Sequence, residues 1–127
     1  MATFAGKRNE VNITKMVQGK TWRVPLRITD EAAGAPVDLA GWTGRAQIRQ
    51  SADSADILAT WTCSILEHAA GDGSWVLWLV MPFATTATID ASGNSLYVYD
   101  AEIVHPTTGE PFEVAYGTVE VIREVTR

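Results

Sequence analysis

The chain has few of the groups from which catalytic or disulfide-bonded sites are built. It contains one cysteine, Cys63, and two histidines, His68 and His105, in 127 residues. A single cysteine cannot form an internal disulfide, and two histidines without a metal-binding spacing do not predict a zinc site. Cys63 lies in an apolar segment, which favours a buried small side chain over a reactive thiol. Because nucleophile-elbow and glycine-rich phosphate motifs are also missing, we expect a non-enzymatic protein without metal or cofactor.

Long hydrophobic runs and an excess of positive charge are also missing. The longest apolar run, residues 75–83, is much shorter than the roughly 20 residues of a membrane span. Residues 1–10 contain no apolar stretch typical of a signal peptide, so we expect synthesis in a cytoplasm. Ten Lys and Arg against fifteen Asp and Glu give a net charge of −5, which argues against a nucleic-acid partner.

Four arginines occur in pairs with four-residue spacing and could share one face of a sheet. They are Arg23, Arg27, Arg45 and Arg49. A solvated strand face is favoured over an anion-binding strip, because strand faces turned to water normally carry such charges.

What the chain does contain is the alternating pattern of β-strands. Residues 21–29 alternate apolar and polar side chains, and Pro25 places this strand at a sheet edge or at a bulge. Further strands are expected at residues 11–17, 45–50, 57–65, 74–81 and in a closing hairpin over 96–127, with a short helical turn at 83–90. The pattern predicts an all-β, immunoglobulin-like two-sheet antiparallel β-sandwich of about seven strands over residues 11–127. A small closed barrel is the alternative, and residues 1–10 are expected to form an extended N-terminal arm.

The closing hairpin has the clearest internal logic. Its strands flank a turn at residues 105–111, and Tyr97, Tyr99, Ala101 and Ile103 occupy every second position, so that they can face one core. Gly117 permits a bulge or a close approach opposite this aromatic strand. Asp100 and Glu102 share the other face, where a wet strand surface is favoured over a pair of carboxylates for acid/base chemistry or calcium.

Five tryptophans in 127 residues are the remaining unusual feature. Trp22, Trp42 and Trp75 fit the core of a sheet protein. We expect Trp61 and Trp78 on one outward face, where they either cover a wide sheet or contact a protein or glycan partner. The predicted interface residues are Phe4, Trp61, Val76, Trp78 and Val80.

Several segments, in this order and spacing, resemble the immunoglobulin-like domains of tailed-phage and prophage structural proteins, particularly the N-terminal domain of baseplate upper proteins. The likeness covers about residues 16–127. The segments are Gly-Lys-Thr-Trp at 19–22, Ala-Pro-Val-Asp-Leu-Ala-Gly-Trp at 35–42, Arg-Ala-Gln-Ile-Arg at 45–49, Gly-Ser-Trp-Val-Leu at 73–77, Tyr-Val-Tyr-Asp-Ala-Glu-Ile at 97–103, Gly-Thr-Val-Glu-Val at 117–121 and Glu-Val-Thr-Arg at 124–127.

The resemblance implies a virion structural protein made in the cytoplasm of a bacterial host. Its expected role is that of an oligomeric adaptor or scaffold in the tail, baseplate or tail-fibre attachment region, and no catalytic residue is carried over. Expected partners are copies of itself and fibre, baseplate or head proteins. The alternatives are a capsid decoration or head-fibre protein and a carbohydrate-binding adhesin module on the particle surface.

Overall fold

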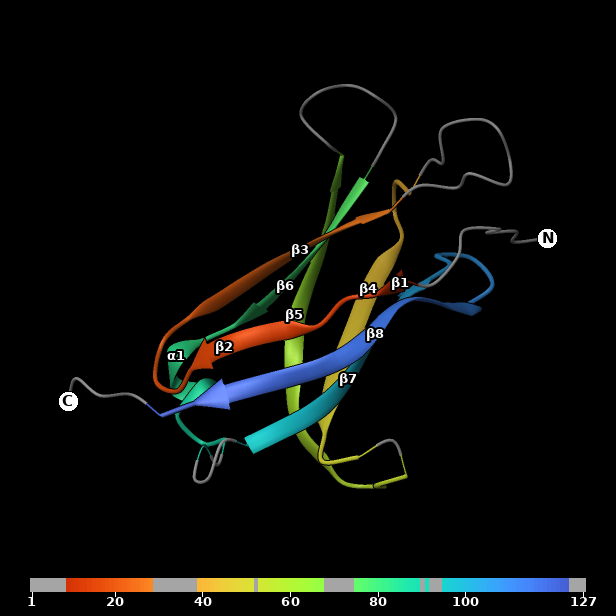
Figure 1. Cartoon of the computed structure of the whole chain (residues 1–127). Coiled ribbons are helices and arrows are strands. Elements are labelled where there is room, and N and C mark those ends of the chain that lie inside the picture. The colour runs from red at the N-terminus through yellow and green to blue at the C-terminus, as the bar shows by residue number, and fades with distance from the viewer. Residues whose placement is uncertain are drawn as a thin grey trace.

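The protein is an all-β structure with one short helical turn, as the sequence predicts (Figure 1). The computed structural model describes residues 9–28, 39–51, 53–67, 75–89, 91 and 95–123. Within these ranges, no helix has the length and apolar character needed to cross a membrane. The elements are β1 (Asn9–Glu10), β2 (Ile13–Val17), β3 (Trp22–Ile28), β4 (Thr43–Arg49), β5 (Ile57–Glu67), β6 (Trp75–Met81), α1 (Phe83–Thr86), β7 (Ser95–Val104) and β8 (Pro111–Ile122).

The strands form a single curled sheet that makes a half-barrel, so the predicted two-sheet antiparallel sandwich is wrong. The strand order is β1-β8-β7-β4-β5-β6-β3, and β2 also pairs with β8. β1 and β2 run parallel to β8, whereas the other pairs are antiparallel. The reason lies in β5, whose residues 57–61 pair with β4 and whose residues 62–67 pair with β6. One long strand thereby joins what would otherwise be two sheets.

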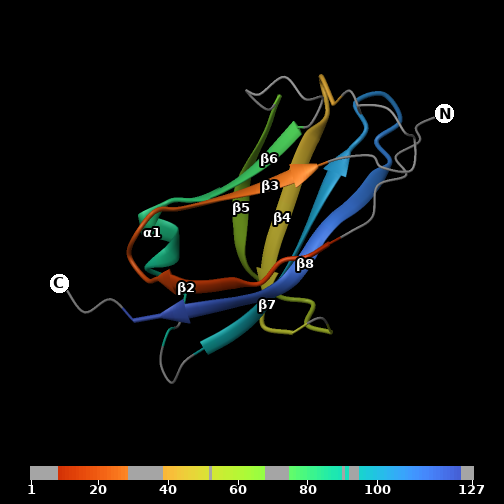
Figure 2. The same ribbon diagram turned by 45° about the horizontal axis from the view of Figure 1, so that its top comes forward.

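The two ends of the curled sheet meet beside α1. β2 and β3 are joined by a short turn at this point and diverge away from it (Figures 1 and 2). The side chain of Thr86 on α1 is fully buried, and its hydroxyl accepts the Gly19 N–H at 3.0 Å and donates to the Lys20 carbonyl at 2.7 Å. The Gln18 amide donates to the Ile89 carbonyl at 2.9 Å. These hydrogen bonds fasten the helical turn to the β2–β3 turn and close this end of the half-barrel.

The hydrophobic core fills the concave side of the sheet. Its most deeply buried large side chains come from β2, β4, β6, β7 and β8 and from the segment before β4, and they are Met16, Leu39, Ile48, Leu77, Leu79, Met81, Ile103, Val119 and Val121. The predicted core face of the closing hairpin is confirmed, because Tyr97, Tyr99, Ala101 and Ile103 are all buried. The curl therefore leaves a convex side on which every other residue of each strand points outward.

Two local predictions are also confirmed. β3, which contains Pro25, lies at an edge of the sheet, where a residue without an N–H is tolerated. Gly117 on β8 stands opposite Tyr99 on β7. The segment between β1 and β2 makes the close approach, because a Cβ atom on Gly117 would clash with the Val11 carbonyl oxygen. The Tyr99 hydroxyl donates to the same carbonyl at 2.7 Å. Burial raises the pKa of Tyr99 to about 12, so this donor keeps its proton at neutral pH.

Candidate interaction faces

The outward side of β3, β6 and β5 carries a cluster of apolar side chains among polar and charged ones. Trp78 at its centre lies opposite Pro25 on β3 and Ser64 on β5, and Val76 lies opposite Leu66. Leu66 is 56% exposed, while Val76, Trp78 and Val80 are half-buried. We call this surface the outer apolar face and define it by Pro25, Leu66, Val76, Trp78 and Val80. Among the described residues, no further strand lies over it.

Trp61 does not belong to this face, so the prediction that it lies beside Trp78 is wrong. The β5–β6 register sets Ser64 opposite Trp78 and Cys63 opposite Leu79. Between residues 59 and 65, the odd-numbered residues of β5 therefore point toward the core, and Trp61 is only 3% exposed. Its buried indole N–H has no hydrogen-bond partner among the residues that the structure describes. Phe4, the remaining predicted interface residue, lies outside the described residues.

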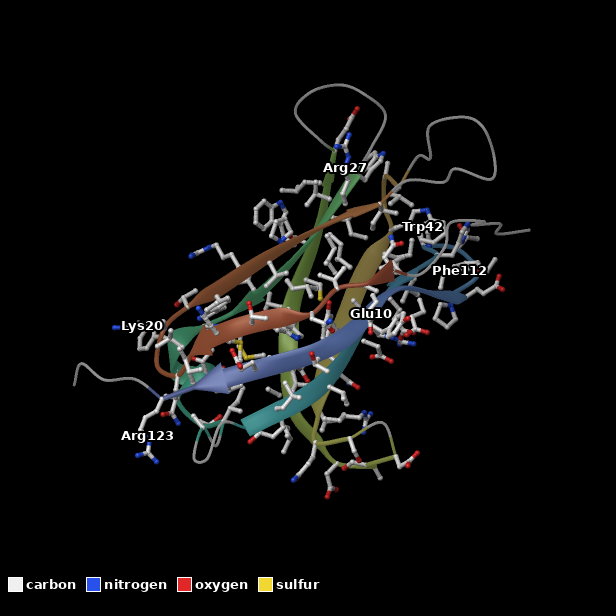
Figure 3. The ribbon with its side chains drawn as sticks, in the orientation of Figure 1. Glu10, Lys20, Arg27, Trp42, Phe112 and Arg123 are labelled. Atoms are coloured by element: carbon white, nitrogen blue, oxygen red, sulfur yellow. The ribbon has the colours of Figure 1, made fainter. Side chains whose placement is uncertain are left out.

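The other three tryptophans pack as predicted. Trp22, Trp42 and Trp75 are partly buried against the core. Trp42 contacts His105 edge-on at a ring distance of 4.9 Å and Phe112 at 5.8 Å (Figure 3). His105 has a structural role in the β7–β8 turn, because its Nδ1 accepts backbone N–H groups at 3.1 and 3.2 Å. His68 lies outside the described residues.

A second surface of interest is a hollow, lined in part by charged side chains, on the outward side of β4, β7 and β8. It has a volume of about 500 Å³. Gln47, Asp100 and Tyr116 form one row across the three strands, and Glu10 on β1 stands next to Tyr116. We call this surface the acidic hollow and define it by Glu10, Gln47, Arg49, Asp100, Glu113 and Tyr116, all of which line it.

Negative charges crowd one another in the acidic hollow. Partial burial raises the pKa of Asp100, and the neighbouring Glu113 and Glu102 raise it further, against a smaller opposing effect of Arg49. The Arg49 guanidinium also donates to the backbone carbonyls of Ser54 at 3.1 Å and Ala55 at 2.8 Å. The ionised form of Asp100 is therefore less stable in the folded protein than in water.

We expect Asp100→Asn to stabilise the fold slightly at pH 7, by less than about 1 kcal/mol because water screens this partly exposed group. A carboxyl group with a raised pKa binds its proton more tightly in the folded than in the unfolded protein, so the group destabilises the fold as rising pH removes that proton. The stability gained by Asp100→Asn should therefore shrink near pH 3, a value at which most carboxyl groups are protonated. Urea unfolding at pH 7 and pH 3 measures the stability difference between the variant and the unchanged chain. Asp53→Asn, in an exposed loop, is the control. A stabilisation that is larger near pH 3 would contradict this assignment.

The four arginines do not form one strip. Arg23 and Arg27 are exposed on β3, and Arg45 and Arg49 lie on β4, so that β5 and β6 separate the two pairs. Arg45 forms an ion pair with Glu102 on β7. The outward placement of Asp100 and Glu102 on one strand face is confirmed.

The described residues show no other grouping suited to metal binding or thiol chemistry. No three His, Cys, Asp or Glu side chains in this part of the chain are placed to hold a metal ion. Cys63 is half-buried and faces the core side of β5. Burial raises the pKa of its thiol to about 11, which keeps it in the unreactive protonated form at neutral pH.

The acidic hollow was not predicted from the sequence as a site. Its carboxylates come from β7 and β8 of the closing hairpin and from β1, which lies far from them along the chain. Only the pair Asp100 and Glu102 was visible as a local pattern. The parallel addition of β1 to β8 brings Glu10 to the hollow, and no sequence pattern indicates that pairing.

No protein-family model matches this chain, and no curated protein matches it significantly. The candidate faces therefore have to be interpreted from their own chemistry.

Proposed function

We propose that this chain is a non-enzymatic assembly protein of a tailed-phage particle, which binds copies of itself and neighbouring virion proteins through the outer apolar face. The observation on which the proposal rests is that face itself. Trp78 and two valines lie in a row on the outward side of β6, with exposed Leu66 beside them. Exposed apolar patches often mark protein–protein interaction sites, and tryptophans are enriched where binding energy is concentrated.

The makeup of the face favours a protein partner over a glycan. A sugar-binding platform of two tryptophans would need Trp61 beside Trp78, and Trp61 is buried on the opposite side of the sheet. The remaining surface consists of aliphatic side chains around one indole, which resembles the centre of a protein interface.

The assignment to a phage particle is supported by the order and spacing of the sequence segments that resemble phage structural domains. The curled sheet differs from the sandwich that this resemblance implies. The proposal covers a position in the tail and baseplate as well as one in the head, because an uncovered apolar face would serve assembly at either place.

Trp78→Ser is expected to weaken self-association about thirtyfold, which corresponds to the roughly 2 kcal/mol lost when a tryptophan is removed from the centre of an interface. Sedimentation velocity over a concentration series measures the effect, and urea unfolding verifies that the variant remains folded. The matched control is Phe83→Ser, because Phe83 is 63% exposed but lies on α1. An association constant that Trp78→Ser leaves unchanged would refute the proposed face.

A further inference from the structure

β2 and β3 are consecutive strands that do not pair with each other. β2 pairs with β8 and β3 pairs with β6, and each has one side on which no described strand lies, which we call its free edge. Residues 18–21 join the two strands in a short turn, where the Lys20 N–H donates to the Val17 carbonyl at 3.2 Å. Strands joined by so short a turn commonly form a hairpin, yet these two diverge from it (Figures 1 and 2).

The free edge of β3 is interrupted by Pro25. The pairing of β3 with β6 runs without a register shift from Trp22 to Ile28 and sets Pro25 opposite Trp78. In an antiparallel pair, the backbone groups of successive residues point alternately toward the partner strand and away from it. Because proline has no N–H, a regular ladder accommodates it where its nitrogen faces away from the partner. Pro25 therefore removes a donor from the middle of the edge that a further strand would use.

The free edge of β2 is interrupted by a β-bulge at Lys15. Between Ile13 and Met16, three steps along β2 match two steps along β8. Lys15 has a φ of +57°, a left-handed conformation that is unfavourable for a residue with a side chain. Its N–H donates to the Glu120 carboxylate at 3.0 Å, outside the backbone ladder.

The bulge changes which residues of β2 face the core. Ile13 and Met16 are both buried, whereas residues three apart in a regular strand point to opposite sides of the sheet. The extra residue also moves the outward N–H and C=O groups on the two sides of the bulge out of step with each other. A regular strand placed against this edge could match one half of β2 and not the other.

The two interruptions lie at corresponding heights above the turn that joins the strands. Counting outward from Val17 and Trp22, which flank the turn, a β2–β3 hairpin would set Lys15 opposite Val24 and Thr14 opposite Pro25. The bulge and the proline would then meet in the middle of the ladder. This explains why the nearest available strand does not pair with β3.

We propose that Pro25 and the Lys15 bulge protect the free edges of β3 and β2 against strand addition by a second copy of the chain. A regular edge strand is a template for pairing with another chain, and prolines, bulges and lysines are the interruptions that prevent such pairing in natural sheets. With both edges interrupted, contacts between copies are left to side-chain surfaces and do not extend through the backbone ladder.

Pro25→Val and a deletion of Lys15 each restore one edge. The valine supplies the missing N–H, and the deletion places Ile13 and Met16 two residues apart, in step with β8. Each change is made in a chain that already carries Trp78→Ser, so that the outer apolar face contributes little to association. We expect each chain to associate at least tenfold more tightly than Trp78→Ser alone, as measured by sedimentation velocity over a concentration series.

Amide hydrogen exchange locates the new contact. In the Pro25→Val chain, protection at Arg23 and at position 25 should rise with protein concentration, because residues two apart on β3 direct their N–H groups to the same edge. In the deletion chain, protection should rise within residues 13–17. Stronger association without a gain of protection at these amides would contradict strand addition.

Lys15→Gly and Pro106→Val are the matched controls. Glycine accepts a positive φ, so Lys15→Gly removes the lysine side chain and keeps the bulge, while Pro106→Val removes an exposed proline from the turn between β7 and β8. Neither should strengthen association. The proposal is overturned if Lys15→Gly associates as tightly as the deletion chain. It is also overturned if Pro25→Val leaves association unchanged, a result that would stand even if the deletion chain did not fold. The proposed function does not depend on this outcome.

Discussion

Gly117→Ala is expected to lower the free energy of unfolding by about 3 kcal/mol, the upper part of the usual range for overpacking a well-packed site. A Cβ atom at this position would stand 2.3 Å from the Val11 carbonyl oxygen and 2.8 Å from Oδ1 of Asn12. The first of these atoms belongs to the backbone and cannot rotate away. The segment that joins β1 to β2 would have to lift from β8 to make room.

Such a shift would break a specific set of hydrogen bonds. Val11 donates its N–H to the Tyr116 carbonyl at 2.8 Å and accepts the Tyr99 hydroxyl. Asn12 Oδ1 accepts the Thr118 N–H at 3.0 Å. Amide hydrogen exchange should therefore report loss of protection at Val11 and Thr118 in the variant, in addition to the lower stability seen by urea unfolding.

Gly109→Ala serves as the comparison for this substitution. Gly109 has a φ of +72° but no atom within 4 Å of an added Cβ, so it should lose only the roughly 1 to 2 kcal/mol of a left-handed backbone conformation. If Gly117→Ala is as stable as the unchanged chain, the close crossing of Val11 over β8 is not present in solution.

Thr86→Val is expected to lower the free energy of unfolding by about 1 to 2 kcal/mol, because it removes the hydroxyl that two part-buried backbone groups use as a partner while preserving side-chain volume. The Thr86 hydroxyl is 0% exposed and serves both the Gly19 N–H and the Lys20 carbonyl. These two groups belong to the turn between β2 and β3, so the loss should loosen the closed end of the half-barrel. Thermal unfolding and hydrogen exchange at Gly19 measure the two consequences.

Thr88→Val is the matched control for this second substitution. The Thr88 hydroxyl donates to the Thr85 carbonyl at 2.7 Å, but the residue is exposed and water can replace the bond. We expect Thr88→Val to change stability by no more than about 0.5 kcal/mol, as is usual at exposed positions. Equal losses of stability in Thr86→Val and Thr88→Val would mean that the contact with α1 does not hold the turn between β2 and β3.

The sequence was most informative where one strand face is buried and the other is wet. Alternation in residues 21–29 and in the closing hairpin predicted the strands, and Pro25 predicted an edge position that the sheet order confirms. A bulge or a close approach at Gly117 opposite the aromatic strand was also predictable, because a residue without a side chain permits it. The curl of the sheet was not predictable in this way, because no local pattern shows that β5 pairs with β4 along its first half and with β6 along its second.

The misplacement of Trp61 has a simple physical origin. Side chains alternate along a strand, so a register that differs by one residue moves every side chain to the other face. The sequence shows β5 and β6 as two apolar runs and does not fix which residues lie opposite one another. With Ser64 opposite Trp78, Trp61 points toward the core. The acidic hollow could not be predicted for the same reason, because the pairing of the strands brings its carboxylates together and the sequence does not show that pairing.

Hydroxyl-radical footprinting over a range of protein concentrations is the most direct test of the claim that the outer apolar face is an assembly surface. Oxidation of Trp78 and Leu66 should fall as concentration rises, because association would exclude water from them. Phe83, which is 63% exposed on α1, provides an internal reference that should keep its reactivity. Equal oxidation of Trp78 and Leu66 at every concentration would contradict the account.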